Sequence, residues 1–166
     1  MAGALIILAE LGSADFAGFD ALRRAHYPAE RNRVPAHLTL FRSLPPSSEE
    51  ELRRRLSRTA SAPAPEARLS GVMDLDSGVA LRVTSPELAA IREELASDLR
   101  GLLTSQDAGG WTPHVTIQNK AEPSEARKLL RRLREQFEPR PIRIAGLQLV
   151  RYAGGPWEPV ASYRFR

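Results

Sequence analysis

The amino-acid sequence predicts an α+β protein with two pseudo-symmetric lobes, each of the order β-α-β-α-β, whose antiparallel-rich sheets flank a central cleft. Two observations support this fold class. Short apolar segments of strand length alternate with segments whose apolar residues recur at helical spacing. In addition, HLTLFRSLPPSSEEELRRRL from position 37 resembles HVTIQNKAEPSEARKLLRRL from position 114. We therefore expect one domain over 1–166, made of two internal repeats at about 1–76 and 77–166.

The first repeat is expected to contain three strands and two helices. The segment ALIILAEL near the N-terminus is apolar enough for a buried strand. Phe16, Phe19 and Leu22 then recur at helical spacing, and Ser47 with Glu50 forms a capping-box pattern that starts a second helix. The expected elements are a strand at 4–11, a helix at 16–25, a strand at 37–44, a helix at 48–59 and a strand at 66–76.

The second repeat follows a hairpin signal at Asp76-Ser77-Gly78. Ser85-Pro86-Glu87 then combines an N-cap residue, a proline at the first helical position and an acidic residue, so it marks a helix start. The expected elements are a strand at 78–84, a helix at 86–103, a loop at 104–112, a strand at 114–119, a helix at 124–137 and closing strands at 141–152 and 157–165.

Composition indicates an ordinary globular protein, with 42% hydrophobic and 27% charged residues. The absence of Cys excludes disulfides, thiolate zinc sites and a Cys nucleophile. The apolar run at 4–9 is too short to span a membrane and has no basic flank before it, so we expect neither a membrane segment nor a signal peptide. We expect a cytoplasmic monomer.

The net charge of +4 and the pI of about 10.1 have two explanations, which stay open at this point. A basic protein can bind a polyanionic partner such as a nucleic acid. Alternatively, a general preference for Arg produces the same balance, since all but two of the 24 basic residues are Arg.

Two short motifs carry the strongest functional signal, His37-Leu38-Thr39-Leu40 and His114-Val115-Thr116-Ile117. Side chains alternate between the two faces of a strand, so His and Thr share one face and the apolar residues take the other. The apolar face fixes each strand to a core, and the His/Thr face is left for something polar. If the repeats pack about a pseudo-twofold axis, the two His/Thr faces lie opposite each other across a groove.

Two such faces suit phosphodiester chemistry. One imidazole can take a proton from the attacking oxygen while the other gives a proton to the leaving oxygen, and the Thr hydroxyls can donate to the phosphate oxygens. This mechanism needs no metal and no cofactor. A single His on a strand is ordinarily structural, but this chain has only three His, and two of them stand in matching motifs.

The doubled motif, its spacing and the repeat order resemble the two-histidine (2H) phosphoesterase superfamily, in particular the 2′-5′ RNA ligase-like family that includes RNA 2′,3′-cyclic phosphodiesterases. The resemblance covers nearly the whole chain. It implies the bilobal fold and the opening of a 2′,3′-cyclic phosphate to a 2′-phosphate, or the making and breaking of 2′-5′ linkages. It also implies that His37 and His114 are the acid and base and that Thr39 and Thr116 bind the phosphate.

Further substrate-binding candidates follow from strand parity and residue type. Many members of this family carry a basic residue soon after each motif, and here the candidates are Arg42 and Lys120. By parity Lys120 and Gln118 share the His114 face, whereas Arg42 has the opposite parity to His37 and needs a bulge or a strand end to reach it. Aromatic residues can stack on a base or simply pack in the core. These candidates are Phe41 on the His37 face, Tyr27, Trp111, Tyr152 and Trp157.

The alternatives are of three kinds. The substrate can be an RNA terminus or a small nucleotide such as a cyclic phosphate of ADP-ribose, and only RNA binding should depend steeply on salt. A non-catalytic module that binds nucleotides or RNA ends is a second alternative, which the two intact His disfavour. A His-based metal site is the third, but zinc sites need three or four ligands and no carboxylate cluster accompanies these His.

Overall fold

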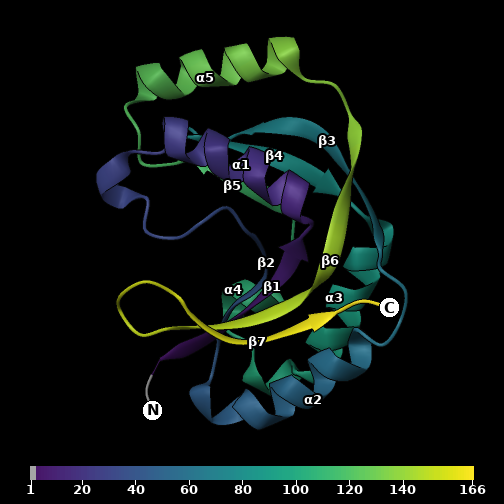
Figure 1. The fold of residues 1–166 in the computed structure, drawn as a ribbon. Helices are drawn as coiled ribbons and strands as arrows, with labels where there is room; N and C mark the ends of the chain where they lie inside the picture. The colour runs from purple at the N-terminus through teal and green to yellow at the C-terminus, as the bar shows by residue number, and fades with distance from the viewer. Residues whose placement is uncertain (1–2) are drawn as a thin grey trace.

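The computed structural model describes residues 3–166, which form a single path of hydrogen-bonded strands in the order β2-β1-β6-β3-β4-β5, with β7 also paired to β6 (Figure 1). All of these strand pairs are antiparallel. The strands are β1 (Ala4–Leu11), β2 (Leu38–Leu44), β3 (Glu66–Asp74), β4 (Val79–Thr84), β5 (His114–Gln118), β6 (Arg140–Tyr152) and β7 (Glu158–Arg164).

The sheet divides into two lobes that share the long strand β6. Residues 144–152 of β6 pair with β1, and residues 140–143 pair with β3. We call β2, β1, the second part of β6 and β7 the first lobe, and the first part of β6 with β3, β4 and β5 the second lobe. The predicted two-lobed antiparallel α+β fold is therefore confirmed.

The strand order is symmetric under exchange of the two repeats. Replacing β1 by β4, β2 by β5 and β3 by β6, and the reverse, turns the order of the path into its own mirror sequence. The last strand of each repeat, β3 or β6, pairs with the first strand of the other repeat. Each lobe is thus built from strands of both repeats, which the linear β-α-β-α-β order alone does not reveal.

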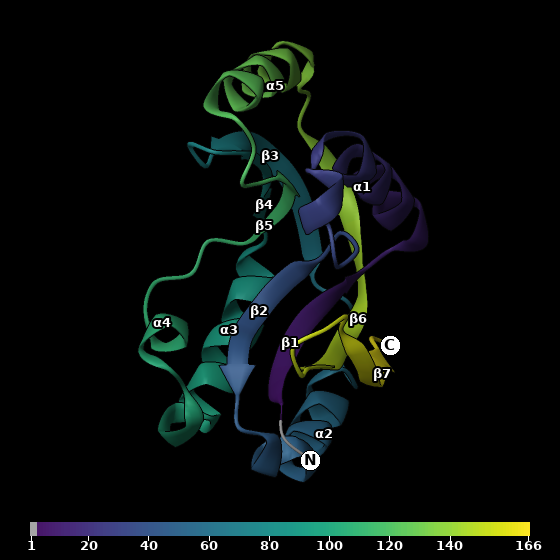
Figure 2. The ribbon, with the colours of Figure 1, turned by 90° about the vertical axis from the view of Figure 1, so that its left-hand side faces the viewer.

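The helices cover the sheet in two pairs. The helices are α1 (Ser13–His26), α2 (Glu49–Thr59), α3 (Pro86–Asp98), the short α4 (Ser105–Ala108) and α5 (Pro123–Gln136). Figures 1 and 2 show α1 and α5 along the second lobe and α2 and α3 along the first. Within 3–166, no helix is both long and apolar enough to cross a membrane.

Apolar periodicity explains this placement. The stripe of α3 buries Leu88, Leu95 and Leu99 in the main core, and α2 buries Leu52 and Leu56 in the same core. These five side chains are at most 2% exposed. Burial of each contributes roughly 1.5–3 kcal/mol, so the helices are fixed to the outer face of the first lobe and the inner face is left for the motifs.

Local differences from the expected elements have simple causes. Helix α1 begins at Ser13, three residues before the predicted start, and α3 ends at Asp98 and continues as a 3₁₀ turn to Leu102. The Ser85 N-cap is confirmed, because its Oγ accepts a hydrogen bond from the Leu88 N–H at 3.0 Å. The capping box at Ser47 is wrong, since the chain forms a 3₁₀ turn at 46–48 before α2.

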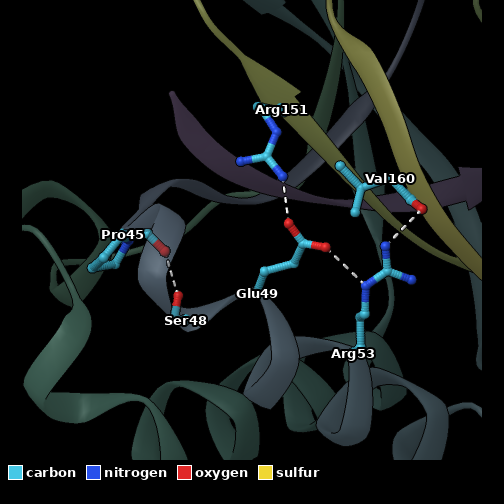
Figure 3. Close-up of polar contacts among 6 residues, drawn as sticks. All are labelled: Pro45, Ser48, Glu49, Arg53, Arg151 and Val160. Atoms are coloured by element: carbon cyan, nitrogen blue, oxygen red, sulfur yellow. Dashed lines mark hydrogen bonds and ion pairs between the residues drawn. The ribbon is translucent and has the colours of Figure 1, made fainter. Parts of the chain in front are cut away.

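The start of α2 is instead fixed by Glu49, as Figure 3 shows. One carboxylate oxygen accepts from Arg151 at the end of β6, and the other accepts from Arg53 Nε at 3.0 Å. Arg53 also donates to the carbonyl of Val160 in β7 at 3.3 Å. These bonds join α2 to two strands of the first lobe, and the arginine hydrogen bonds lower the pKa of Glu49.

Candidate active site

The two motif strands, β2 and β5, stand at opposite ends of the strand path but lie close together in space. The sheet curls so that Cα atoms of β2 and β5 approach within 8 Å (Figure 2). His37 directly precedes β2, and His114 is the first residue of β5. His37, Thr39, His114 and Thr116 are all partly exposed, whereas Leu38, Leu40, Val115 and Ile117 are buried. The predicted division of each motif into a polar and an apolar face is confirmed.

Both imidazoles are held in the same way. Nδ1 of His37 lies 2.8 Å from the carbonyl oxygen of Pro35, and Nδ1 of His114 lies 2.7 Å from that of Thr112. A carbonyl oxygen only accepts, so in each ring the proton of the neutral form is on Nδ1. Nε2 of each ring therefore carries the lone pair that can take a proton, and in the protonated ring it carries the proton that can be given.

Each motif strand contains a β-bulge directly after its Thr. Leu8 pairs with Thr39 and Ile7 with Phe41, so Leu40 is the extra residue in β2. In β5 the extra residue is Ile117, at the equivalent position of the motif. A bulge shifts the alternation of side chains by one residue. The side chains beyond each Thr therefore lie on the face opposite to the one that simple alternation predicts.

The bulges correct two predictions and support a third. Phe41 is not on the His37 face; it is 0% exposed in the core, 4.5 Å from the Arg92 guanidinium. Gln118 is not on the His114 face either, since it is 4% exposed. Arg42 is exposed on the other side from Phe41, which is the His37 side, and its charge lowers the pKa of His37. The bulge at Leu40 therefore turns Arg42 toward the His37 side.

Strand parity does not apply to Lys120, because this residue lies beyond the end of β5. The strand ends at Gln118, and Lys120 follows in a left-handed conformation with φ 56°. The aromatic residues predicted as stacking candidates lie in different places. Trp157 lines a cavity with His37, Tyr152 is 47% exposed at the end of β6, and Trp111 donates from Nε1 to the Thr39 carbonyl at 3.0 Å. Tyr27 packs against Arg23.

Arg23 is a site residue that our sequence reasoning missed. It is 3% exposed on α1, and its Nη1 donates to the Thr116 carbonyl at 3.0 Å. Helix α1 of the first repeat thus holds the motif strand of the second. A signal was present, because Arg23 lies seven residues after Phe16 and four after Phe19, on the apolar stripe of the helix.

The surroundings of His37 favour its neutral form. Burial lowers the pKa of His37 to about 4, against the hydrogen bond to Pro35, which raises it. The positive charges of Arg23, His114 and Arg42 lower this pKa further. The two motif imidazoles are therefore within electrostatic reach of each other, in a region of positive potential that attracts an anion.

Asp107 is the second residue that was missed, because it stands in a segment predicted as a loop. It belongs to α4 and is 1% exposed. Its carboxylate accepts from the backbone N–H of Arg42 at 2.9 and 3.0 Å and from that of Ser43 at 3.1 Å. These bonds fix the backbone of β2 at a second irregularity of the β1–β2 pairing, and so they orient Arg42.

Between residues 3 and 166, no group of three or more His, Asp or Glu side chains is placed to hold a metal ion. The groups that gather around the motifs are cations and hydroxyls, which suit a phosphate rather than a metal ion.

Solved structures share this fold. TT0787 of Thermus thermophilus is 19% identical, with a TM-score of 0.68 over 98% of each chain. A crystal structure described as a phosphoesterase is 18% identical, with a TM-score of 0.62 over 99% of each chain. E. coli LigT complexed with NADP+ is also 18% identical, with a TM-score of 0.61 over 98% of each chain. At these identities the likeness establishes the fold.

The sequence itself establishes the family. A comparison with curated proteins finds no match. The family model of the 2′-5′ RNA ligase superfamily, by contrast, matches residues 12–156, a span that contains both His motifs and strands β2 to β6. The resemblance to two-histidine phosphoesterases is thereby confirmed, and the chain belongs to the 2′-5′ RNA ligase superfamily.

Proposed function

We propose that this protein is a metal-independent phosphodiesterase that opens 2′,3′-cyclic phosphates of nucleotides or RNA ends to 2′-phosphates. The observation that carries this proposal is the matched pair of imidazoles, each held through Nδ1 by a backbone carbonyl. Matched orientation leaves Nε2 of each ring for proton transfer, which is what an acid and base pair requires.

The reaction divides between the two imidazoles. Nε2 of one neutral His takes a proton from water as the water oxygen forms a bond to phosphorus. The bond from phosphorus to the 3′-oxygen breaks, and the other His, in its protonated form, gives its proton to that oxygen. The product carries a 2′-phosphate and a 3′-hydroxyl. If a 5′-hydroxyl of another strand replaces water in this scheme, a 2′-5′ linkage forms, so the same groups can support ligation.

The remaining groups stabilise the negative charge that gathers on the phosphate. The hydroxyls of Thr39 and Thr116 share a face with the two His and can donate to its oxygens, and Arg42 adds a positive charge on the first side. The low pKa of His37 keeps this ring neutral at pH 7 in the free protein, ready to accept a proton. Phosphate bound beside His37 raises the pKa of this ring again, because a nearby anion favours the charged form.

A nucleotide substrate agrees with what related structures contain. E. coli LigT has been crystallised with NADP+, with 3′-AMP and with ATP, at 18%, 18% and 20% identity to this chain. These complexes are properties of E. coli LigT. For this chain they support a nucleotide or an RNA terminus as the class of substrate.

The experiment is to incubate the protein with the four 2′,3′-cyclic mononucleotides and with an oligonucleotide that ends in a cyclic phosphate. ³¹P NMR and chromatography identify the products. We expect 2′-phosphates. Failure to open any of these substrates, while nucleotides still bind, would assign the fold to a binding module instead. Measuring rates at 50 and 200 mM salt separates the substrate classes, because contacts with several RNA phosphates make binding steeply salt-dependent.

A further inference from the structure

A cavity of about 450 Å³ lies on the inner face of the first lobe, beside the first motif. Its wall includes His37 and Trp157, whose rings meet edge-on with centroids 4.7 Å apart. Within the described part of the chain, the second motif contributes no residue to this wall. The volume is typical of a small-molecule site. Because His37 is part of its wall, the cavity adjoins the candidate phosphate site on the His37 side.

The floor of the cavity is the sheet itself, where side chains of β1, β6 and β7 stand in rows across the strands. The two rows are Leu8–Gln148–Ser162 and Glu10–Gly146–Arg164. Gly146 is at the centre of the second row, where the backbone of β7 and the Glu10 side chain leave no room for a Cβ. A Cβ added there would lie 2.4 Å from the Tyr163 carbonyl oxygen and 3.0 Å from Oε1 of Glu10. The side chains of Glu10 and Arg164, from the strands on either side of the glycine, approach each other as an ion pair.

These two charged side chains retain unused hydrogen-bonding capacity. Oε1 of Glu10 is buried and has no hydrogen-bond partner among residues 3–166. Oε2 of Glu10 lies 3.7 Å from Nη2 of Arg164, which is too long for a hydrogen bond. Because the terminal torsion of Glu is broad, the carboxylate can turn either oxygen toward the cavity. The acceptor oxygens of the Glu10 carboxylate and the N–H donors of the Arg164 guanidinium therefore lie side by side at one wall of the cavity.

The chemistry of this wall selects among nucleobases. Apolar side chains of Leu8, Phe16 and Trp157 suit a flat ring. Guanine places two N–H donors, N1 and the N2 amino group, next to two acceptors, O6 and N7. Carboxylates pair with adjacent N–H donors, and Arg is the usual partner of guanine O6 and N7. Adenine offers one amino donor beside a ring acceptor, and uracil offers one N–H between two carbonyls.

We propose that this cavity binds the guanine base of the nucleotide whose cyclic phosphate lies at His37, with Glu10 facing N1–H and the N2 amino group and Arg164 facing O6. The inference rests on the proposed function, because the reacting phosphate is what anchors the nucleotide beside His37. It makes the protein selective for a guanosine at the terminus that it opens.

The test measures kcat/KM for 2′,3′-cyclic GMP, AMP, CMP and UMP, together with the affinity of 2′-GMP and 2′-AMP by calorimetry. We expect cyclic GMP to be preferred over each other substrate by at least about tenfold, since a hydrogen bond to a charged group contributes this much. Glu10→Gln exchanges an acceptor for a donor. It should lower kcat/KM for cyclic GMP about ten- to a hundredfold and raise it for cyclic AMP. Glu138→Gln, at an exposed position outside the cavity, is the matched control.

The outcomes separate this inference from the proposed function. Equal kcat/KM for the four nucleotides, or an unchanged preference in Glu10→Gln, overturns the guanine site while the phosphodiesterase stands. No turnover combined with tighter binding of 2′-GMP than of 2′-AMP keeps the guanine site and overturns the reaction. If Glu10→Gln fails to fold, Arg164→Gln replaces it, because 73% of that side chain is exposed. The preference for guanine should fall in that variant too.

Discussion

The hydrogen bonds between the Asp107 carboxylate and the backbone of β2 give the most specific structural prediction. Asp107→Asn keeps the shape of the side chain but removes its charge and one acceptor oxygen. At 1% exposure, the site admits no water to replace the lost bonds. The amide NH₂ of the new Asn must face the backbone N–H of either Arg42 or Ser43, which both donate to the carboxylate in the native protein.

The magnitude follows from these contacts. A hydrogen bond to a charged group contributes roughly 1.5–3 kcal/mol, and a buried N–H left without an acceptor costs about 1–3 kcal/mol. Asn retains one acceptor, so only part of the total is lost. We expect the free energy of unfolding to fall by about 2–4 kcal/mol, a large fraction of the roughly 5–15 kcal/mol typical of a domain. Because Arg42 loses its fixed orientation, kcat/KM should fall as well.

Urea unfolding, followed by tryptophan fluorescence and far-UV circular dichroism, measures the change. Asp98→Asn is the matched control, because Asp98 pairs with Arg55 at 3.2 Å on the surface with 43% of its side chain exposed. Such a pair contributes less than about 1 kcal/mol. If Asp107→Asn unfolds within about 0.5 kcal/mol of the native protein, the carboxylate does not hold β2, and the reasoning from burial and bond number fails.

Four further predictions concern the site. Thr39→Val and Thr116→Val should each lower turnover on the order of ten- to a thousandfold with the fold intact, and unchanged turnover in both would make the hydroxyls structural. NMR titration should give His37 a pKa of about 4, raised in Arg42→Gln because a positive charge is removed; a pKa near 6.5 would contradict the burial argument. Since unfolded His37 takes its proton near pH 6.5 and folded His37 only near pH 4, stability should decrease as pH falls through this window, and less so in His37→Asn. EDTA should leave the rate unchanged, and a rate lost to EDTA and restored by a divalent metal would overturn the metal-free mechanism.

Much of the fold could be predicted because it depends on local patterns. The alternating strand and helix signals and the repeat of the His motif gave the element order and the two lobes. The exchange of β3 and β6 between the lobes could not be predicted in this way. Which strand pairs with which is decided by burial of the whole sheet, and an internal repeat is compatible with either arrangement.

In the candidate site, too, the features that depend on local patterns could be predicted and the others could not. The polar and apolar faces of His37, Thr39, His114 and Thr116 follow from strand alternation. The positions of Phe41 and Gln118 were wrong because each motif strand has a bulge directly after its Thr, which alternation cannot anticipate. A signal existed in β2, where Leu40 and Phe41 are adjacent large apolar residues and break the alternation.

The two missed residues depend on long-range contacts. Asp107 acts on backbone groups more than sixty residues earlier in the chain, through hydrogen bonds that no local pattern encodes. Arg23 contacts the Thr116 carbonyl across the two repeats. Its place on the apolar stripe of α1 was readable, but the partner of a buried Arg can be identified only from the assembled fold.

The proposed mechanism is tested most directly by the turnover of a 2′,3′-cyclic nucleotide in the native protein, in His37→Ala, in His114→Ala and in the double variant. We predict that the native protein yields the 2′-phosphate and that each single variant loses about 10²–10⁴-fold in kcat, the usual contribution of one positioned acid or base. The double variant should be little worse than either single one, since groups that act as a unit are not additive. Near-native turnover in either single variant, with the fold intact, would contradict the two-histidine mechanism.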